Sequence, residues 1–296
     1  MILLFPSGGR VGNQLFQMAY TLSLARPREY IVTRGFGQAR SYLRGGWKRK
    51  WINIDSRPLG SLIQNFIEPL CWQLLIKTGL ASSVLEMEDK TLKIRKGKLR
   101  RLTIVKGFFE TEEFMAGTTR EKMRLKAKYI SAARRQLERG GAAGTLVFIH
   151  IRKSDFGSNR VNGLSIELPD GYYRSGVDQV LERIPDPYFV IVGDSPDYAE
   201  RLFRDLERKL VSRSAAVVDL ALMSLCSEGI LSNSTFAWWG AYMGNPGGRY
   251  IGPKYWWGWA SGEWYPPGMH TSLISTYIEV EREGKKALPL ATLRAR

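Results

Sequence analysis

Two short polar stretches, each directly after an apolar run, combine side chains that could hold an anion. The first, H-I-R-K-S-D, brings His150, Arg152 and Asp155 to the end of the apolar run T-L-V-F-I. The guanidinium group of an arginine is a permanently charged, planar fork that suits a phosphate or a diphosphate. A structural Arg152–Asp155 pair beside a buried histidine would explain the same pattern, and these three residues alone do not decide between the two.

The second stretch, S-N-S-T, lies between the apolar G-I-L and F-A-W-W-G-A-Y-M. Ser234 and Thr235 would stand at the start of a helix, where the first amide groups lack intrahelical partners and the helix dipole is positive. Serine and threonine are also preferred capping residues, so N-capping explains the same sequence, and capping and phosphate binding are compatible. We expect Trp238 and Trp239 to pack this helix against a sheet.

A third candidate is the loop G-G-R-V-G-N-Q at 8–14, which follows the apolar M-I-L-L-F. Its glycines would let the backbone approach a ligand closely, yet the loop matches neither the G-x-G-x-x-G dinucleotide fingerprint nor the P-loop. An oxidoreductase or a nucleoside triphosphatase is therefore not favoured. The chain has two histidines and two distant cysteines, which we expect to be buried thiols, so a metal site is not favoured either.

The elements that would position these residues alternate regularly in the second half of the chain. The apolar spacing predicts strands at 145–151, 187–194, 215–219 and 229–232, and helices at 171–184, 195–210, 220–227 and 236–244. Strands joined by helices form a doubly wound, parallel α/β sheet, which binds ligands at the carboxyl ends of its strands. The three stretches described above, and the G-D-S after the second of these strands, all follow predicted strands.

The first half is less regular. A strand at 1–5 precedes the glycine loop and a helix at 15–26. An apolar stripe at 62–80 predicts a helix that faces the core or lies at a membrane interface, and not a membrane span. A basic helix at 112–139 ends in R-G-G-A-A-G, a break typical of a domain boundary. We therefore expect an N-terminal domain at 1–144, a C-terminal domain at 145–275, and a tail at 276–296 that could pack back on the N-terminal domain.

The net charge of +16 comes entirely from residues 1–144, because the rest of the chain carries equal numbers of acidic and basic residues. The densest basic runs are at 44–51, 93–101 and 120–128. Either these runs are solvated surface, or the N-terminal half meets an anionic partner: a membrane surface, an acidic or lipid-linked glycan, or a nucleic acid. The N-terminus does not read as a signal peptide, so we expect a cytoplasmic protein; if the anionic partner is a membrane, the contact is peripheral and on its inner face.

The motifs H-x-R-x-x-D and S-N-S-[ST]-F-x-W-W-G-A, in this order and separation and together with the glycine loop, resemble glycosyltransferase family 11, the alpha-1,2-fucosyltransferases, in particular its bacterial members. The resemblance runs from residue 8 to about residue 255. It implies a GT-B architecture, in which two Rossmann-like domains face a cleft. It also implies an inverting, metal-independent transfer of fucose from GDP-fucose to a glycan hydroxyl, forming an alpha-1,2 bond to galactose in surface polysaccharide synthesis.

The same resemblance implies a donor site that draws on several strand ends: Gly12, Asn13, His150, Arg152, Asp194, Asp219, Ser234, Thr235 and Phe236. Arg152 would neutralise the departing diphosphate in place of a divalent cation. Ser234, Thr235 and the Phe236 amide would hold the phosphates from the other side, and Gly12 and Asn13 would close over the sugar-phosphate region. His150, Asp194 and Asp219 are candidates for guanine or ribose contacts.

The group that takes the acceptor proton stays open, with Asp155, His150 and Glu167 as candidates and the leaving phosphate as another. Asp155 could equally be bound to the Arg152 loop. Ser154 stands where the family usually has glycine, and the loop at 8–14 is longer than the usual G-G-L-G-N-Q. Another GDP-deoxysugar or another fucose linkage is therefore an alternative. A nucleic-acid-binding protein would explain the charge but not the strand-end motifs, so we expect no nucleic-acid partner.

Overall fold

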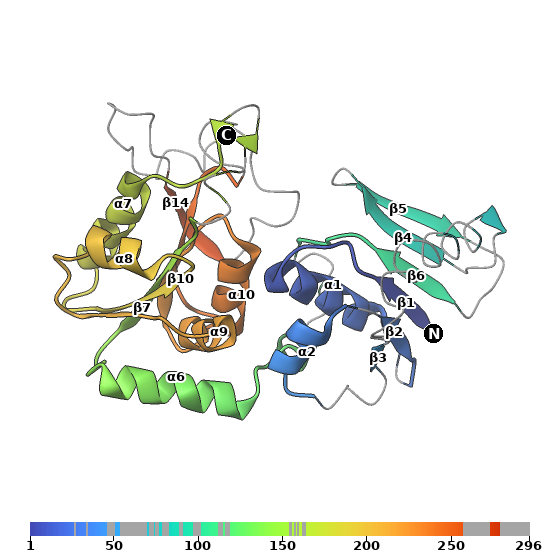
Figure 1. Ribbon diagram of the computed structural model, residues 1–296, viewed down its shortest axis with the longest axis horizontal. Coiled ribbons are helices and arrows are strands. Elements are labelled where there is room, and N and C mark those ends of the chain that lie inside the picture. The colour runs from blue at the N-terminus through green and yellow to red at the C-terminus, as the bar shows by residue number, and fades with distance from the viewer. Residues whose placement is uncertain are drawn as a thin grey trace. The chain divides into compact units, whose positions relative to one another are not determined.

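Two sheets flanked by helices organise the chain in the computed structural model (Figure 1). One sheet belongs to the unit Met1–Arg124 and the other to the unit Leu125–Arg296. The structure describes residues 1–26, 28–33, 35–45, 51–53, 70, 74, 77–78, 83–88, 91–96, 102–111, 115, 119–153, 156, 158, 160–161, 164–256 and 273–278. The predicted helix at 62–80 and the basic run at 93–101 lie largely outside these residues.

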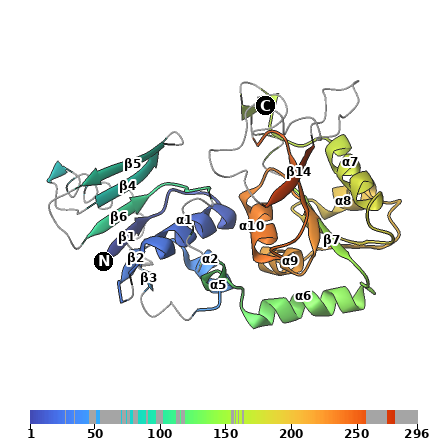
Figure 2. The same cartoon turned by 180° about the vertical axis from the view of Figure 1, so that it is seen from behind.

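The first unit contains a mostly parallel sheet with the strand order β3-β2-β1-β6-β4-β5, in which only the β4–β5 pair is antiparallel among the described strands. Its strands are β1 (Ile2–Phe5), β2 (Ile31–Thr33), β3 (Trp51–Asn53), β4 (Ser83–Glu88), β5 (Thr91–Lys96) and β6 (Thr103–Lys106). Its described helices are α1 (Val11–Leu24), α2 (Gly37–Tyr42) and α5 (Thr119–Lys122). Helix α1, whose residues 15–22 are all buried, packs against α2 and α5 (Figure 2).

The second unit contains a parallel sheet with the order β11-β10-β7-β12-β13-β14. Its strands are β7 (Leu146–Ile151), β10 (Tyr188–Gly193), β11 (Lys209–Val211), β12 (Glu228–Ile230), β13 (Tyr250–Pro253) and β14 (Ile274–Ile278), and a small hairpin joins β8 (Arg160–Val161) to β9 (Leu164–Ser165). Its helices are α6 (Ala127–Arg139), α7 (Asp170–Leu181), α8 (Pro196–Leu202), α9 (Ala216–Ser224) and α10 (Thr235–Met243). The predicted parallel α/β sheet is confirmed.

Side chains alternate across the central strand β7 and divide the second unit's core into two layers. Val147, Ile149 and Ile151 join a buried cluster with residues of α7 and α8. Phe148 and His150 point to the other face, where α9 and α10 pack on each other (Figure 1). That face is filled by apolar residues of α10, whose tryptophan pair is fully buried, as expected from the sequence.

Two features of the second unit differ from the predictions. Residues 215–219, predicted as a strand, mostly form the first turns of α9, and the strand that pairs with β10 is β11 at 209–211. Helix α9 is apolar on nearly every side because α6, α10 and β10 all pack against it, so its valine-rich start carries no helical periodicity. The helix predicted at 195–210 is shorter, ending at Leu202, and residues 209–210 pair with β10 as part of β11.

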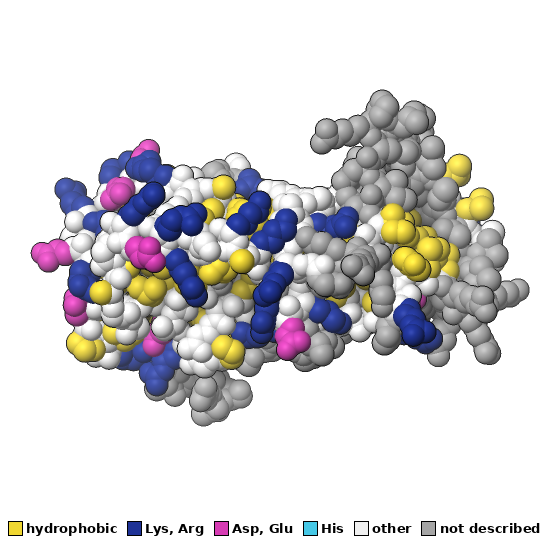
Figure 3. All heavy atoms as spheres, turned by 90° about the horizontal axis from the view of Figure 1, so that it is seen from below, with side chains coloured by type: hydrophobic (Ala, Val, Ile, Leu, Met, Phe, Trp, Pro, Cys, Tyr) yellow, Lys and Arg dark blue, Asp and Glu magenta, His cyan; other side chains and the backbone are white. Residues whose placement is uncertain are grey.

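Helix α6 belongs to the second unit, although the sequence indicated a division at residue 144. It packs on α9, and Nε2 of Gln136 donates to Oγ of Ser214 at 2.5 Å. Its solvent side is basic: the exposed residues include Lys128, Arg134, Arg135 and Arg139. Figure 3, which looks at the side on which α6 lies, shows many lysine and arginine side chains and few acidic ones. Some of the basic residues that give residues 1–144 their positive net charge therefore belong to the second unit.

The structure describes the predicted tail and the two cysteines only in part. Residues 276–278 of the predicted tail form part of β14, and 279–296 lie outside the described residues. Cys226 is a buried thiol, as predicted, and Cys71 also lies outside the described residues. In the part of the chain that the structure describes, no helix has the length and apolar character needed to span a membrane.

Candidate active site

Strand β7 lies between β10 and β12, so the segments that follow these three strands leave the second sheet next to one another. They carry Arg152, Asp194 and the S-N-S-T turn. Contacts join them in two places, between Arg152 and Asp194 and between His150 and Ser232. Three of the four polar stretches found in the sequence thus meet at the carboxyl edge of one sheet, where parallel α/β sheets bind ligands.

His150 connects β7 to the turn that precedes α10. Its Nδ1 lies 2.8 Å from Oγ of Ser232, its ring lies 5.8 Å from that of Phe236, and the residue is 2% exposed. Burial, and next the nearby charge of Arg152, lower the pKa of His150 to about 3, against an opposing effect of Asp194. The ring is therefore neutral at physiological pH, and in this structure it fixes the turn relative to the strand.

Asp194 holds Arg152. Its Oδ2 lies 3.3 Å from Nε of Arg152, and its Oδ1 accepts hydrogen bonds from the backbone amide of Lys153 at 2.9 Å and from Oγ of Ser195 at 3.3 Å. The guanidinium also lies over the ring of Phe156, with 5.2 Å from Cζ to the ring centroid. A guanidinium that is held by its Nε and by one face has a fixed plane, which is the requirement for bidentate anion binding. Asp194, for which the resemblance implied a guanine or ribose contact, here orients Arg152.

The S-N-S-T turn caps α10. Ser234 is the N-cap residue, and its Oγ accepts a hydrogen bond from the Phe236 amide at 3.3 Å. Thr235 is the first residue of the helix, and Thr235 and Phe236 are both partly exposed. The capping predicted from the sequence is confirmed, and the start of α10 meets strand β7 at His150, two residues before Arg152.

Asn233 has a different task from its neighbours in the turn. Its Nδ2 donates to the backbone carbonyl oxygens of Ile166 at 2.8 Å and of Trp256 at 3.0 Å, and the residue is 3% exposed. It thereby holds the segment after the β8–β9 hairpin and the segment after β13 against the start of α10. The sequence contained no sign of this role, because the two carbonyl groups belong to residues far away in the chain.

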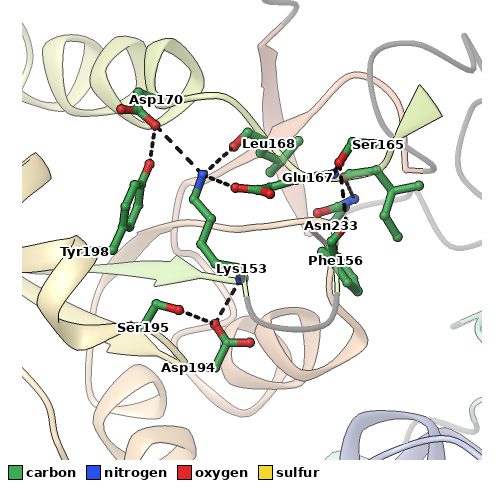
Figure 4. Close-up of polar contacts among 11 residues, drawn as sticks. Lys153, Phe156, Ser165, Glu167, Leu168, Asp170, Asp194, Ser195, Tyr198 and Asn233 are labelled. Carbon is green, nitrogen blue, oxygen red and sulfur yellow. Dashed lines mark hydrogen bonds and ion pairs between the residues drawn. The ribbon is translucent and has the colours of Figure 1, made fainter. Parts of the chain in front are cut away.

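Lys153 was also missed by sequence reasoning (Figure 4). Its Nζ lies 2.5 Å from Oε1 of Glu167 and 3.8 Å from Oδ1 of Asp170, and it donates to the carbonyl oxygen of Leu168 at 3.2 Å. Glu167, a candidate for the general base by position alone, is therefore paired with an ammonium group. The only sequence signal for Lys153 was a second cation directly after Arg152.

Three of the remaining predicted residues, Asp219, Gly12 and Asn13, lie on helices. Asp219 lies on α9 and accepts a hydrogen bond at 2.6 Å from Oγ of Ser212, at the end of β11. Gly12 and Asn13 lie in the first turn of α1, in the first unit. Asp155, together with Ser154, lies outside the described residues.

The glycine loop before α1 is braced from inside the first unit. Oε1 of Gln17 accepts from the Ser7 amide at 3.0 Å, and Nε2 of Gln17 donates to the Gly8 carbonyl oxygen at 3.2 Å. The Ser7 hydroxyl accepts from the Gly107 amide at 2.7 Å, which ties the loop to the end of β6. Gly9 has φ +81°, and a Cβ atom there would lie 2.6 Å from Nδ2 of Asn13, so the loop needs glycine at this position.

A carboxyl group that the sequence did not single out follows β6. Burial raises the pKa of Glu110 to about 7. Its neighbour Phe109 has φ +53°, and the Phe109 ring stacks on Tyr20 of α1 with 4.0 Å between the ring centroids. Glu110 therefore lies at the carboxyl edge of the first sheet, beside the strand that leads into the glycine loop.

Comparison with known proteins identifies the family. The family described as Glycosyl transferase family 11 matches residues 86–258, which is more than half of the chain. The chain belongs to glycosyl transferase family 11. An alpha-1,2-colitosyltransferase of Escherichia coli is 28% identical to it over 264 residues, covering 80% of this chain and 86% of the relative. The resemblance to this family is confirmed, and the chain is a glycosyltransferase.

Solved structures agree on the fold of this family 11 glycosyltransferase. The fucosyltransferase NodZ from Bradyrhizobium matches with a TM-score of 0.50 at 12% identity, covering 82% of this chain and 92% of that protein. A mutant of Arabidopsis thaliana FUT1 in complex with GDP matches with a TM-score of 0.51 at 13% identity, covering 82% and 68%. At such identities the likeness concerns the fold alone, which is of the GT-B type with two Rossmann-like units, as expected.

Replacing Asn233 with aspartate should destabilise the glycosyltransferase by about 3 kcal/mol or more at pH 8, because a buried carboxylate would then face two carbonyl oxygens. Thermal or urea unfolding measures this loss. At pH 5 part of it should return, since a protonated carboxyl can donate one hydrogen bond. Asn245→Asp is the matched control, because Oδ1 of Asn245 only accepts a hydrogen bond from the Gly247 amide in an exposed turn. Equal losses for the two variants would contradict the role of Asn233.

The Asp219 carboxyl should make stability fall as pH rises. Burial raises the pKa of Asp219 to about 7, although the Ser212 hydrogen bond opposes the shift. Between its unfolded pKa near 3.8 and about 7 the folded state therefore binds more protons than the unfolded state, and stability decreases through that window. Asp219→Asn should match the wild type near pH 4 and be more stable above pH 7. Urea unfolding at both pH values tests this, and a constant difference between the two proteins would contradict it.

Proposed function

We propose that this glycosyltransferase transfers fucose from GDP-fucose to a hydroxyl group of a glycan, forming an alpha-1,2 bond to galactose, by an inverting reaction that needs no divalent metal. The observation that carries the proposal is the fixed guanidinium of Arg152 at the carboxyl end of β7, the strand whose His150 meets the capped start of α10. The family and the GDP held by the FUT1 neighbour support a GDP-sugar donor. The acceptor would belong to a surface polysaccharide or oligosaccharide.

The proposed chemistry depends on charge that appears on the leaving group. As the bond between the anomeric carbon and the β-phosphate oxygen breaks, GDP gains negative charge, and a preorganised cation lowers the energy of that transition state. Arg152, whose plane Asp194 fixes, would supply the cation. The first amide groups of α10 and the hydroxyls of Ser234 and Thr235 would bind the phosphates from the other side. His150 and Asp219 would contribute to the nucleoside pocket, and Asp155 would serve Arg152 or the acceptor.

The first unit would provide acceptor contacts, with Gly12 and Asn13 closing over the sugar-phosphate region. Its basic character and the basic solvent side of α6 (Figure 3) support contact with an anionic membrane surface, or with an anionic lipid-linked acceptor, on the cytoplasmic side. Sedimentation with vesicles tests the membrane contact. The protein should sediment with anionic vesicles and not with neutral ones, and equal binding to both would refute the contact.

A second candidate donor is a GDP-linked colitose, which the alpha-1,2-colitosyltransferase relative supports. Colitose differs from fucose by the loss of one hydroxyl group, so the same diphosphate site would serve either sugar. Discrimination between them depends on whether the sugar pocket offers a hydrogen-bond partner to that hydroxyl. Such a partner, when left unpaired, disfavours the donor that lacks the hydroxyl.

One set of measurements tests the proposal. Calorimetric titration with GDP and with RNA separates a glycosyltransferase from a nucleic-acid-binding protein. Incubation with GDP-fucose or GDP-colitose and a panel of galactose-terminated acceptors, in EDTA, with NMR of the product, gives donor, linkage and metal dependence. We expect GDP binding and an alpha-1,2-fucosylated product in EDTA. Binding of RNA without GDP would refute the enzyme, and transfer of colitose alone would replace fucose with the second donor.

A further inference from the structure

Lys153 connects Arg152 to a segment that the proposed mechanism does not use (Figure 4). Its ammonium group meets three oxygen atoms: those of Glu167 and the Leu168 carbonyl, in the link between the β8–β9 hairpin and α7, and one of Asp170, the first residue of α7. It also lies 4.3 Å from the centroid of the Tyr198 ring on α8, and the Tyr198 hydroxyl donates to Asp170. Two of these oxygens lie within hydrogen-bond distance of Nζ, and the Asp170 carboxylate adds an ion-pair contact at 3.8 Å.

This arrangement differs from an ordinary surface ion pair. Exposed pairs contribute little because water screens them and because two long side chains must be ordered for one contact. The Lys153 side chain is only 15% exposed, and its partners come from one continuous segment whose carbonyl group at Ile166 is also held by Asn233. The segment and the lysine therefore order each other at several points, so little additional ordering is needed for each contact.

The backbone of the same residue takes part in the Arg152 site. The Lys153 amide donates to Oδ1 of Asp194 at 2.9 Å, and Oδ2 of that carboxylate pairs with Nε of Arg152. The peptide between Arg152 and Lys153 is thus anchored on both sides. The Asp194 carboxylate holds its amide, and the Glu167–Asp170 segment holds the side chain that follows. A shift of Lys153 would move both the backbone of Arg152 and the carboxylate that sets its plane.

We propose that Lys153 is a positioning residue that acts through Arg152: its ammonium group anchors the peptide that carries the phosphate-binding guanidinium. This inference rests on the proposed function, in which Arg152 neutralises the departing diphosphate. Lys153 itself does not contact the reacting atoms. A displacement of about 1 Å in a catalytic group costs on the order of 10²-fold in rate, so the loss of the anchor has a measurable effect.

The test compares Lys153→Ala with Arg183→Ala. Arg183 pairs with Glu228 at 2.8 Å in the same unit, with similarly shielded side chains, but Glu228 is the first residue of β12 and lies at the opposite edge of the sheet. Lys153→Ala loses contacts with two carboxylates and Arg183→Ala with one, so Lys153→Ala should lose somewhat more thermal stability, and kcat is compared at a temperature where both variants are folded. We expect kcat to fall between about 10-fold and 10²-fold in Lys153→Ala with the acceptor KM unchanged, and to stay within about twofold of wild type in Arg183→Ala.

Two further readouts separate positioning from a structural role. Lys153→Arg keeps the cation and should recover most of kcat. The affinity for GDP, measured by calorimetry in Lys153→Ala, Arg152→Ala and the double variant, shows whether the effects are coupled. If Lys153 acts through Arg152, the double variant binds GDP no more weakly than Arg152→Ala. Additive losses overturn the proposal, and so does a kcat in Lys153→Ala equal to that of Arg183→Ala.

The outcomes also distinguish this inference from the proposed function. If the wild-type protein transfers sugar and Lys153→Ala does so equally well, the positioning role alone is refuted. A change confined to the acceptor KM refutes it as well, because Lys153 would then serve acceptor binding. Wild-type protein that neither binds GDP nor transfers sugar refutes the proposed function, and the positioning role with it.

Discussion

Arg152→Ala should lower kcat by at least about 10²–10³-fold, the loss seen when one preorganised stabilising group is removed from a transition state. It should also weaken GDP binding by roughly 10-fold to 100-fold, the equivalent of one or two hydrogen bonds to a charged group. The physical reason is twofold. The diphosphate loses its cation, and Asp194, which is 3.3 Å from Nε in the wild type, keeps a negative charge near the place where more negative charge would develop. Initial rates with the donor that proves active, together with calorimetry, measure both effects.

The unpaired charge of Asp194 can be removed separately. In the double variant Arg152→Ala with Asp194→Asn, the repulsion from the carboxylate is gone, so GDP affinity should recover in part while kcat stays low. Arg152→Lys keeps a charge but loses the planar fork and the Nε contact, and should therefore restore binding better than turnover. Arg213→Ala is the control, because Arg213 pairs with Asp197 in a largely exposed ion pair. Near-normal turnover of a folded Arg152→Ala would refute the assigned role.

The sequence predicted the parts of the site that depend on local pattern. Apolar runs followed by polar residues marked the ends of β7, β10 and β12, because the interior of a parallel sheet is apolar and its carboxyl edge is where polar groups meet a ligand. The capping role of Ser234 was likewise readable, since N-cap preference depends only on neighbouring backbone amides. These predictions needed no knowledge of contacts between distant residues.

The rest could not be read from the sequence because it depends on long-range contacts. Lys153 meets Glu167 and Asp170, and Asn233 meets Ile166 and Trp256, across segments whose course between the elements no periodicity specifies. The early residues of α9 were assigned to a strand for a related reason: a helix buried on nearly all sides has lost the polar face from which helices are recognised. Likewise, the basic residues of α6 could not be assigned to the second unit without its packing on α9.

A glycine beside the site leads to the largest expected effect on stability. Gly193 ends β10 and has φ +151°, a conformation that residues with a side chain rarely adopt. It pairs with Ile151 of β7, and a Cβ atom on it would lie 2.1 Å from the Ile151 carbonyl oxygen and 2.9 Å from the carbonyl carbon. Both are backbone atoms of the central strand, so neither can rotate away, and the two strands would have to separate.

Gly193→Ala should therefore cost at least about 4 kcal/mol of unfolding free energy, at the upper end of what single substitutions do. Urea unfolding of the purified variant measures the loss. If the loss exceeds the unfolding free energy of the wild-type protein, the variant will fail to accumulate as soluble protein. Gly247→Ala is the matched control in the same unit, because the atom nearest to its added Cβ would be 3.8 Å away. Gly240→Ala should fall between them, since its Cβ would lie 2.7 Å from the Cβ and Sδ atoms of Met223, which belong to a side chain and not to the backbone. Equal stability of the Gly193 and Gly247 variants would contradict the argument. Because Gly193 directly precedes Asp194, any Gly193→Ala protein that does fold should also bind GDP more weakly, since the backbone shift that relieves the clash moves the carboxylate that orients Arg152.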